Sequence, residues 1–114
     1  MLRSCSGRAT TLTKRGMHVA ALQLHVSDSM SDNIARAASL IDRAAEQGAS
    51  LVTLPECFTG KYGVDHFAKW KEAVPTDASS AGPLGGAAMM ADRARHHGIV
   101  VTGGVIEEHG GKLW

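Results

Sequence analysis

Residues 51–58 read LVTLPECF, a short apolar run that ends in a proline, a glutamate and a cysteine. Apolar and β-branched side chains in so short a run predict a buried β-strand, and Pro55 ends it because proline has no backbone N–H to donate. Glu56 is therefore predicted at the C-terminal end of a strand. In open α/β sheets this end borders the reactive crevice, so Glu56 is a candidate for proton transfer. The alternative is a solvated loop glutamate without a chemical role.

Length and composition point to one small domain, and the alternation of strand and helix patterns along it to the α/β class. The chain has 114 residues, enough for a modest core. Two Trp, one Tyr and two Phe are too few for a base-stacking surface. Residues 1–17 hold four of the 12 basic residues and none of the 11 acidic ones, which leaves eight basic against 11 acidic in the body. This mildly acidic body argues against a nucleic-acid partner.

The N-terminal segment differs in composition from the body. Residues 1–16 are rich in Ser, Thr and Arg and carry no acid, which is typical of an organellar transit peptide; an unstructured extension, or a true start at Met17, is the alternative. The only two cysteines, Cys5 and Cys57, favour a reducing compartment over a disulfide framework. No apolar run approaches the length of a membrane span. We expect a mitochondrial or cytoplasmic protein without a membrane partner.

The body, residues 17–114, begins with a strand, a helix and a second strand. Met17–Val26 is nearly continuously apolar, as in a central strand. Ser31 can cap a helix that stops at Gly48. The apolar positions of this helix recur at helical spacing and are Ile34, Ala37, Ala38, Ile41, Ala44 and Ala45. A helix between two apolar strands predicts a βαβ unit with parallel strands.

Two further helices are predicted after Glu56. A short one covers about Asp65–Glu72, and Pro75–Pro83 reads as an exposed connection. Another begins at Pro83 or Leu84 and ends before Gly98. Its apolar positions are Leu84, Ala87, Ala88, Ala91 and Ala94.

The C-terminal part predicts a third buried strand and a hairpin. Ile99–Ile106 is apolar but interrupted by Gly103-Gly104, where we expect a bulge or a close approach of backbone. His109-Gly110-Gly111 predicts a hairpin turn, and Lys112–Trp114 begins a strand that stops at once. An apolar strand edge at the end of a chain predicts a truncated domain.

Other candidate motifs have simpler explanations. His96 and His97 lie in the last turn of a predicted helix, where cationic groups are favourable, so a metal site is not expected there. Gly82–Gly86 lacks the Lys-Ser/Thr of a phosphate loop and is interpreted as a helix entry. Cys57 is interpreted as a small buried thiol, because neighbouring side chains in extended backbone point to opposite faces and Glu56 could not readily take its proton. No metal or organic cofactor is expected.

Taken together, VAALQLHV, EQGASLVTLPECF, GKYG and GIVVTGGVIEEHGGKLW resemble the N-terminal part of the nitrilase, or carbon-nitrogen hydrolase, superfamily. The resemblance covers residues 17–114 and is greatest to the amidase branch that includes omega-amidase. It implies part of a four-layer α-β-β-α sandwich and a Glu-Lys-Cys triad. In that triad Glu56 would be the general base, and the cysteine would form a thioester with a small amide, such as an omega-amide of a dicarboxylate.

The same resemblance places the other two triad members after the KLW hairpin, beyond Trp114. Cys57 does not match the nucleophile, and the lysine's position is matched by none of Lys61, Lys69, Lys71 and Lys112. The resemblance therefore implies that the 114 residues alone are inactive and that the intact protein is a homo-oligomer. Phe58 and Tyr62, near Glu56, are candidate substrate contacts, although aromatic residues at a strand end are as often part of the core.

Two other functions remain open. A non-catalytic short product could bind a full-length relative, or be vestigial. A small nucleotide-binding βαβ domain is disfavoured because no phosphate loop is present.

Overall fold

Three short parallel strands form the main sheet of the molecule. They are β1 (Val19–Ala21), β2 (Leu51–Thr53) and β4 (Val100–Thr102), in the order β1-β2-β4. The computed structural model describes residues 16–74 and 85–114. Because β2 is parallel to both neighbours, the predicted βαβ unit is confirmed. Within the described sheet, however, β2 is the central strand and β1 lies at the edge, and β1 is much shorter than the predicted Met17–Val26.

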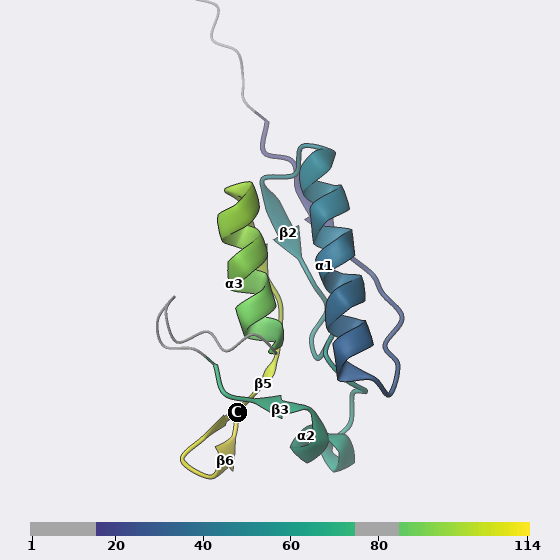
Figure 1. The fold of residues 1–114 in the computed structure, drawn as a ribbon, viewed down its shortest axis with the longest axis vertical. Helices are drawn as coiled ribbons and strands as arrows, with labels where there is room; N and C mark the ends of the chain where they lie inside the picture. Colours follow the sequence, from purple (N-terminus) through teal and green to yellow (C-terminus); the bar gives the residue numbers. More distant parts are fainter. Residues whose placement is uncertain (1–15, 75–84) are drawn as a thin grey trace, which may run out of the picture.

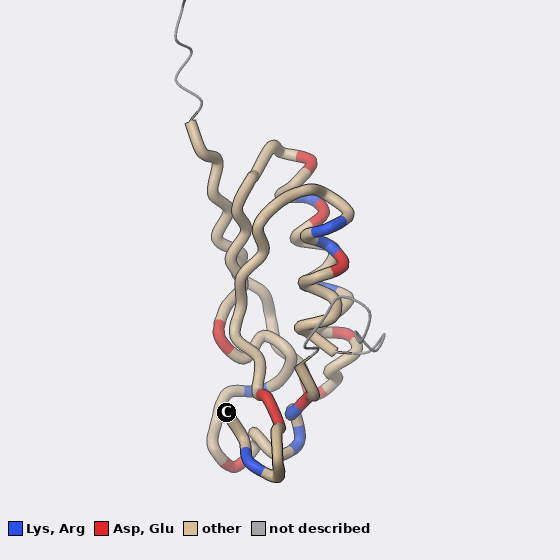
Figure 2. Tube along the Cα trace, turned by 90° about the vertical axis from the view of Figure 1, so that its left-hand side faces the viewer, with Lys and Arg blue, Asp and Glu red and all other residues tan. Residues whose placement is uncertain are grey.

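Two helices cover one face of this sheet. Figure 1 shows α1 (Met30–Glu46) and α3 (Gly86–His97) side by side in front of β2. One row of side chains on the helix-facing side of the sheet is formed by Ala20, Val52 and Val101. These side chains pack in the apolar core with Ala37 and Ile41 of α1. Seen from the side, the helices lie on one side of the strands only (Figure 2). This main sheet and the two long helices therefore form one sheet layer and one helical layer.

The opposite face of the sheet carries a row of apolar side chains. Val19, Leu51 and Val100 lie side by side in the strand register. Val19 is 59% exposed and Val100 is 58% exposed, in contrast to the fully buried Val52 on the same sheet. An antiparallel sheet can leave one face to water, but a parallel sheet usually has both faces covered.

Helix α1 begins two residues earlier than predicted. Ser29, rather than Ser31, is the N-cap, because its hydroxyl accepts the N–H of Asp32 at 3.3 Å. The helix ends at Glu46 and is followed by Gly48 with φ +89°, a conformation that glycine adopts without strain.

Two predicted elements differ in the structure. The predicted helix over Asp65–Glu72 is a shorter helix, α2 (Val64–Trp70), followed by strand β3 (Lys71–Glu72). The predicted strand Ile99–Ile106 is two strands, β4 and β5 (Ile106–His109), in different sheets. Gly103 and Gly104 lie between them, so these glycines mark a change of sheet rather than a bulge.

The second sheet has the order β3-β5-β6, with β6 at Lys112–Leu113. Strands β3 and β5 are parallel, whereas β5 and β6 form an antiparallel hairpin that pairs His109 with Lys112. Gly110 and Gly111 close it with φ +59° and +74°, as a two-residue primed turn requires. The predicted hairpin is confirmed.

Two predictions fall at least partly outside the described residues. The connection Pro75–Pro83 lies there, as do Pro83 and Leu84, the predicted start of the third helix. In the described part, Gly85 is the N-cap of α3 and Gly86 its first residue. The predicted end is confirmed, because Gly98 is the C-cap with φ +64°.

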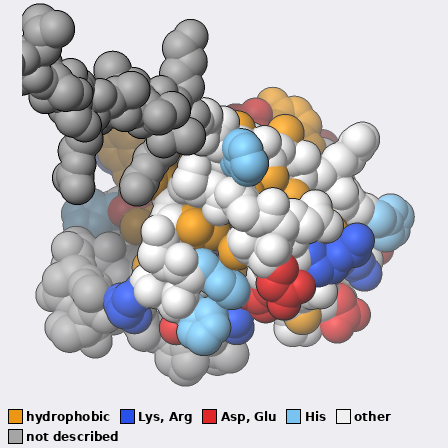
Figure 3. Space-filling model, turned by 90° about the horizontal axis from the view of Figure 1, so that it is seen from above, with side chains coloured by type: hydrophobic (Ala, Val, Ile, Leu, Met, Phe, Trp, Pro, Cys, Tyr) orange, Lys and Arg blue, Asp and Glu red, His pale blue; other side chains and the backbone are white. Residues whose placement is uncertain are grey.

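The end of the sheet remote from Glu56 carries the C-terminal ends of both long helices. Figure 3 looks at this end and shows histidine and charged side chains gathered on it. Arg43 lies in the last turn of α1, and Arg95, His96 and His97 lie in that of α3. Cationic groups are favourable at these positions because the helix dipole is negative there. No helix in the described part of the chain is both long and apolar enough to span a bilayer.

Candidate functional site

Glu56 lies just after β2, at the point where the chain leaves the main sheet. The N–H of Leu54 donates to the carbonyl of Thr102 at 2.8 Å, which continues the β2-β4 ladder beyond the last strand residue. Three residues later the N–H of Cys57 donates to the carbonyl of Gly104 at 3.1 Å. Glu56 is therefore held between two backbone bonds, one to the last residue of β4 and one to the segment that follows it, and its own side chain is exposed. The predicted strand-end position is confirmed.

Two glycines allow the backbone to pass this close. A Cβ on Gly104 would lie 3.2 Å from both Cα and Cγ of Glu56. A Cβ on Gly103 would lie 3.0 Å from Cβ of Leu54. The close approach predicted for this glycine pair is therefore confirmed, and it is made to the segment that carries Glu56.

A buried turn follows Glu56. The N–H of Gly60 donates to the carbonyl of Cys57 at 3.3 Å, and Cys57 has φ +55°, which is uncommon outside glycine. Phe58 and Thr59 are fully buried. Gly60 packs so closely against the indole of Trp70 that a Cβ there would overlap the ring. An exposed carboxylate is thus attached directly to a rigid, buried turn.

The thiol of Cys57 is buried beside Trp70 and Ile106. Burial raises its pKa above the ordinary value of 9.0, and the charge of Glu56 raises it further. The backbone here is left-handed rather than extended, so the predicted reason for separating the two side chains was wrong. The two side chains nevertheless lie in different surroundings, because Cys57 is buried in the core while Glu56 is exposed. A protonated, buried thiol is a poor nucleophile.

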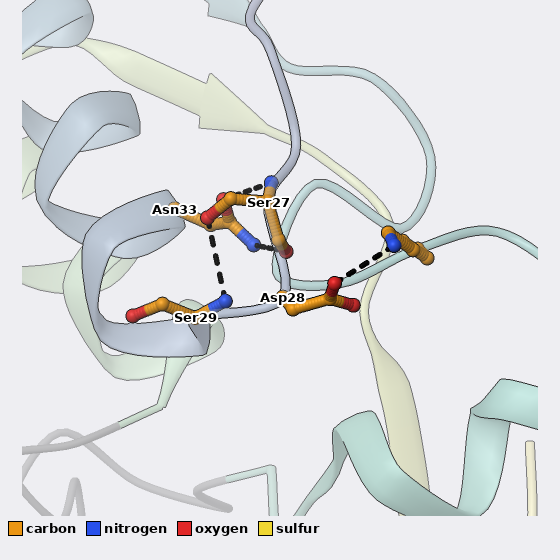
Figure 4. A network of polar contacts seen from close by, with 5 residues as sticks. Ser27, Asp28, Ser29 and Asn33 are labelled. Atoms are coloured by element: carbon orange, nitrogen blue, oxygen red, sulfur yellow. Dashed lines mark hydrogen bonds and ion pairs between the residues drawn. The ribbon is translucent and has the colours of Figure 1, made fainter.

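A fully buried asparagine of α1 joins two loops beside Glu56. The Asn33 Nδ2 group donates to the carbonyl of Ser27 at 2.8 Å and to that of Thr59 at 3.0 Å. Its Oδ1 accepts from the N–H of Ser27 at 2.8 Å and lies 3.1 Å from the Ser27 hydroxyl (Figure 4). Asn33 lies one turn before Ala37 on the buried face of α1, and that position was the sequence signal for its burial.

An ion pair joins the same two loops at the surface. Lys61 Nζ lies 2.9 Å from Asp28 Oδ2 (Figure 4), and this hydrogen bond lowers the pKa of Asp28 below its ordinary value. Both side chains are about half exposed or more, so the pair contributes little to stability.

Residues 18–114 match the profile of the family described as carbon-nitrogen hydrolase. The chain belongs to the carbon-nitrogen hydrolase family. It is 40% identical over 97 residues to omega-amidase NIT2 of Danio rerio. It is 39% identical to omega-amidase NIT2 of Mus musculus and 38% identical to that of Homo sapiens over the same length. Each match covers 84% of this chain and 32% of the relative, so the chain spans about a third of the length of these curated relatives.

Three lysines in the described part of the chain make contacts away from Glu56. Lys71 Nζ pairs with Glu108 at 3.0 Å, and Lys69 Nζ lies 4.3 Å above the ring of Trp70. Lys112 lies in β6, where it is exposed. The contacts described for three of these lysines, at positions 61, 69 and 71, are therefore with groups other than Glu56.

The two candidate substrate contacts lie in contrasting surroundings. Phe58 has no exposed surface and is part of the core under α1 and α3. Tyr62 is 72% exposed and meets Phe67 edge to face at a ring separation of 5.8 Å. Tyr62 is therefore the member of the pair that a small molecule can reach, and a substrate role for either residue stays a prediction.

Of the two adjacent histidines, His97 makes a polar contact between the two long helices, while His96 meets the ring of His97 edge to face. His97 Nε2 lies 2.7 Å from Asp42 Oδ1, and Arg93 lies 3.4 Å from the same oxygen. In residues 16–74 and 85–114, no group of three His, Cys, Asp or Glu side chains is arranged to hold a metal ion.

Proposed function

We propose that this chain is the base-bearing part of an amidase that hydrolyses a small amide, such as the omega-amide of a dicarboxylate. Glu56 is the general base of a Glu-Lys-Cys triad, and the lysine and the cysteine lie outside residues 1–114. The observation that carries the proposal is the placement of Glu56, an exposed carboxylate held at the C-terminal end of a central parallel strand by the bonds of Leu54 and Cys57.

The proposed chemistry is covalent catalysis. Glu56 takes the proton of the cysteine thiol, and the thiolate attacks the amide carbon. The lysine ammonium stabilises the negative oxygen of the tetrahedral intermediate. The intermediate collapses as Glu56 returns the proton to the leaving nitrogen, which releases ammonia and leaves a thioester. Glu56 then takes a proton from water, whose attack on the thioester releases the acid, and Glu56 passes that proton to the departing sulfur, which restores the thiol.

Three features support the assignment of roles. Cys57 has a raised pKa and a buried thiol, which suits a core residue better than a nucleophile. Lys61 is paired with Asp28 across the two loops. The similarity to omega-amidases extends over 97 residues that include Glu56.

The exposed sheet face supports a further part of the proposal. Because a parallel sheet is usually covered on both faces, we infer that a second sheet of the complete protein packs on the row formed by Val19, Leu51 and Val100. With its own helical layer, that sheet would complete a four-layer α-β-β-α sandwich. We also propose that the complete protein is a homo-oligomer, in mitochondria or the cytoplasm.

The test compares the 114-residue chain with the complete translation product that contains it. The intact mass of the endogenous protein, captured with an antibody against residues 51–58, identifies that product. Ammonia release is then measured with a dicarboxylate monoamide, a plain amide, a carbamoyl compound and a nitrile. We expect the complete product to release ammonia from the monoamide, and we expect the 114-residue chain to release none. Absence of turnover on all four, or an endogenous mass near 12.0 kDa, would favour the non-catalytic alternative.

A further inference from the structure

We propose that Asn33 is a positioning residue for Glu56. It anchors the turn that carries Glu56 to helix α1, and this inference rests on the function proposed above. The bond that matters is Nδ2 of Asn33 to the carbonyl of Thr59 at 3.0 Å, which joins parts of the chain 26 residues apart.

The side-chain amide of Asn33 is completely buried, and both its nitrogen and its oxygen make hydrogen bonds. It donates to two carbonyl groups and accepts from the N–H of Ser27, with the Ser27 hydroxyl also within 3.1 Å. Arg36 adds a longer contact to Oδ1 at 3.3 Å. A buried amide with this many partners has a fixed orientation, because leaving either carbonyl without a donor is costly.

The turn after Glu56 is held on two sides by buried polar bonds. The N–H of Cys57 is bound to Gly104, on the β4 side, and the carbonyl of Thr59 is bound to Asn33, on the α1 side. Without the second bond, the turn would be held to the sheet at Cys57 alone, so it would move against α1 and its N–H groups, that of Cys57 included, would open to water more often. A displacement of about 1 Å at a catalytic group can cost roughly 100-fold in rate.

The other contacts around the turn do not replace the buried hydrogen bond by which Asn33 links the turn to α1. The first residue of α3, Gly86, presses on the same turn, since a Cβ there would lie 2.5 Å from Cγ2 of Thr59. This contact is apolar and does not satisfy the Thr59 carbonyl. The ion pair of Asp28 with Lys61 also joins the two loops, but it is exposed and weak.

Asn33→Asp tests this bond with a minimal change of shape. Aspartate can accept from Ser27 but cannot donate when ionised, so it places a carboxylate against the carbonyl groups of Ser27 and Thr59. Asn33→Ser is the second variant, in case the first does not fold. Asp28→Asn is the matched control, because it replaces a carboxylate by an amide in the loop just before α1 and makes no contact with Thr59.

The experiment has two measurements on the complete translation product. The first is amide hydrogen exchange of residues 57–60 against that of the β2 and β4 strands. The second is kcat and KM for a dicarboxylate monoamide. We expect the Asn33 variants to exchange at least 10-fold faster at 57–60 with the strands unchanged, and to lose roughly 10- to 100-fold in kcat with KM within threefold. The control should match wild type in both measurements.

The outcomes separate this inference from the proposed function. If exchange rises throughout the chain, if kcat is unchanged, or if neither Asn33 variant folds, Asn33 is a structural residue and the inference is wrong. If wild type has no turnover, the proposed function fails, whereas exchange that rises only at 57–60 still supports the anchor.

Discussion

The carboxylate of Glu72 accepts the N–H of Gly86 at 2.7 Å, and its other oxygen accepts the next N–H, that of Ala87, at the same distance. Helix α3 has glycine as its N-cap and no side-chain cap of its own. A residue of β3 therefore caps it from 14 positions upstream, with a charge that the helix dipole favours. The same first turn of α3 packs on Phe58 and Thr59, next to Glu56.

Replacing Glu72 tests this cap. Glu72→Ala removes both acceptors and should lower the free energy of unfolding by about 1–2 kcal/mol, whereas Glu72→Gln keeps one acceptor and should cost about half as much. Urea denaturation of each variant measures these losses. Glu46→Gln, at an exposed position in the last turn of α1, is the control and should stay within about 0.5 kcal/mol of wild type. Equal stability of Glu72→Ala and wild type would show that the cap is dispensable.

The contact of Gly60 with Trp70 predicts a large difference between two glycine substitutions. Gly60→Ala places a methyl group inside the buried indole and should cost about 3 kcal/mol or more. Gly98→Ala has open space around it but a φ of +64°, so it should cost only about 1 kcal/mol. The unfolding temperatures of the two variants compare the cost of steric overlap at position 60 with the cost of backbone strain at position 98. Similar losses at the two positions would mean that the turn yields to the added methyl group.

The contact between Asp42 and His97 predicts an acid-sensitive contribution to stability. The hydrogen bond from His97 holds the pKa of Asp42 below its ordinary value of 3.8, while partial burial opposes the shift. A carboxyl whose pKa is lower in the folded state stabilises the fold above the unfolded value, and this contribution is lost as the pH falls through the folded value. Asp42→Asn should therefore cost about 0.5 kcal/mol near neutral pH, allowing for solvent screening.

That cost should shrink to nothing as the pH falls below 3.8. Urea denaturation at a series of pH values from about 7 to about 3 measures the difference between wild type and variant. Asp92→Asn, at a more exposed carboxylate of α3, is the control. A difference that stays constant over the whole range would contradict the assigned cause.

The raised pKa of Cys57 predicts a slow thiol. In a Cys5→Ser background, alkylation by iodoacetamide near pH 8 should be on the order of 10-fold or more slower in the folded chain than in urea. The folded rate reports both the low thiolate fraction and the burial of the sulfur. A folded rate as fast as the unfolded one would reveal an accessible thiolate, and Cys57 would then have to be considered as a nucleophile.

The sequence predicts the position of Glu56 because the determinants are local. An apolar run followed by Pro55 specifies both the strand and its end, and the helix between two such runs makes the strands parallel. The hairpin at Gly110-Gly111 follows from local rules in the same way.

The remaining features depend on contacts that are remote in sequence. Ile99–Ile106 reads as one strand because a hydrophobic pattern does not say which sheet a residue joins. Glu72 looks like the end of a helix, and only the folded chain brings it to Gly86. Asn33 occupies a buried helical position where an apolar residue is expected, and its partner Thr59 lies 26 residues away. The residues that hold the surroundings of Glu56 in place were therefore harder to predict than Glu56 itself.

The most direct test of the central claim is the rate of ammonia release by the complete translation product carrying Glu56→Gln. Glutamine keeps the shape of the side chain but cannot take a proton, so kcat should fall by about 100-fold or more while the unfolding temperature stays close to that of wild type. Glu46→Gln should retain full activity. If the Glu56→Gln protein released ammonia as fast as wild type, Glu56 would not be the general base, and the proposed mechanism would be wrong.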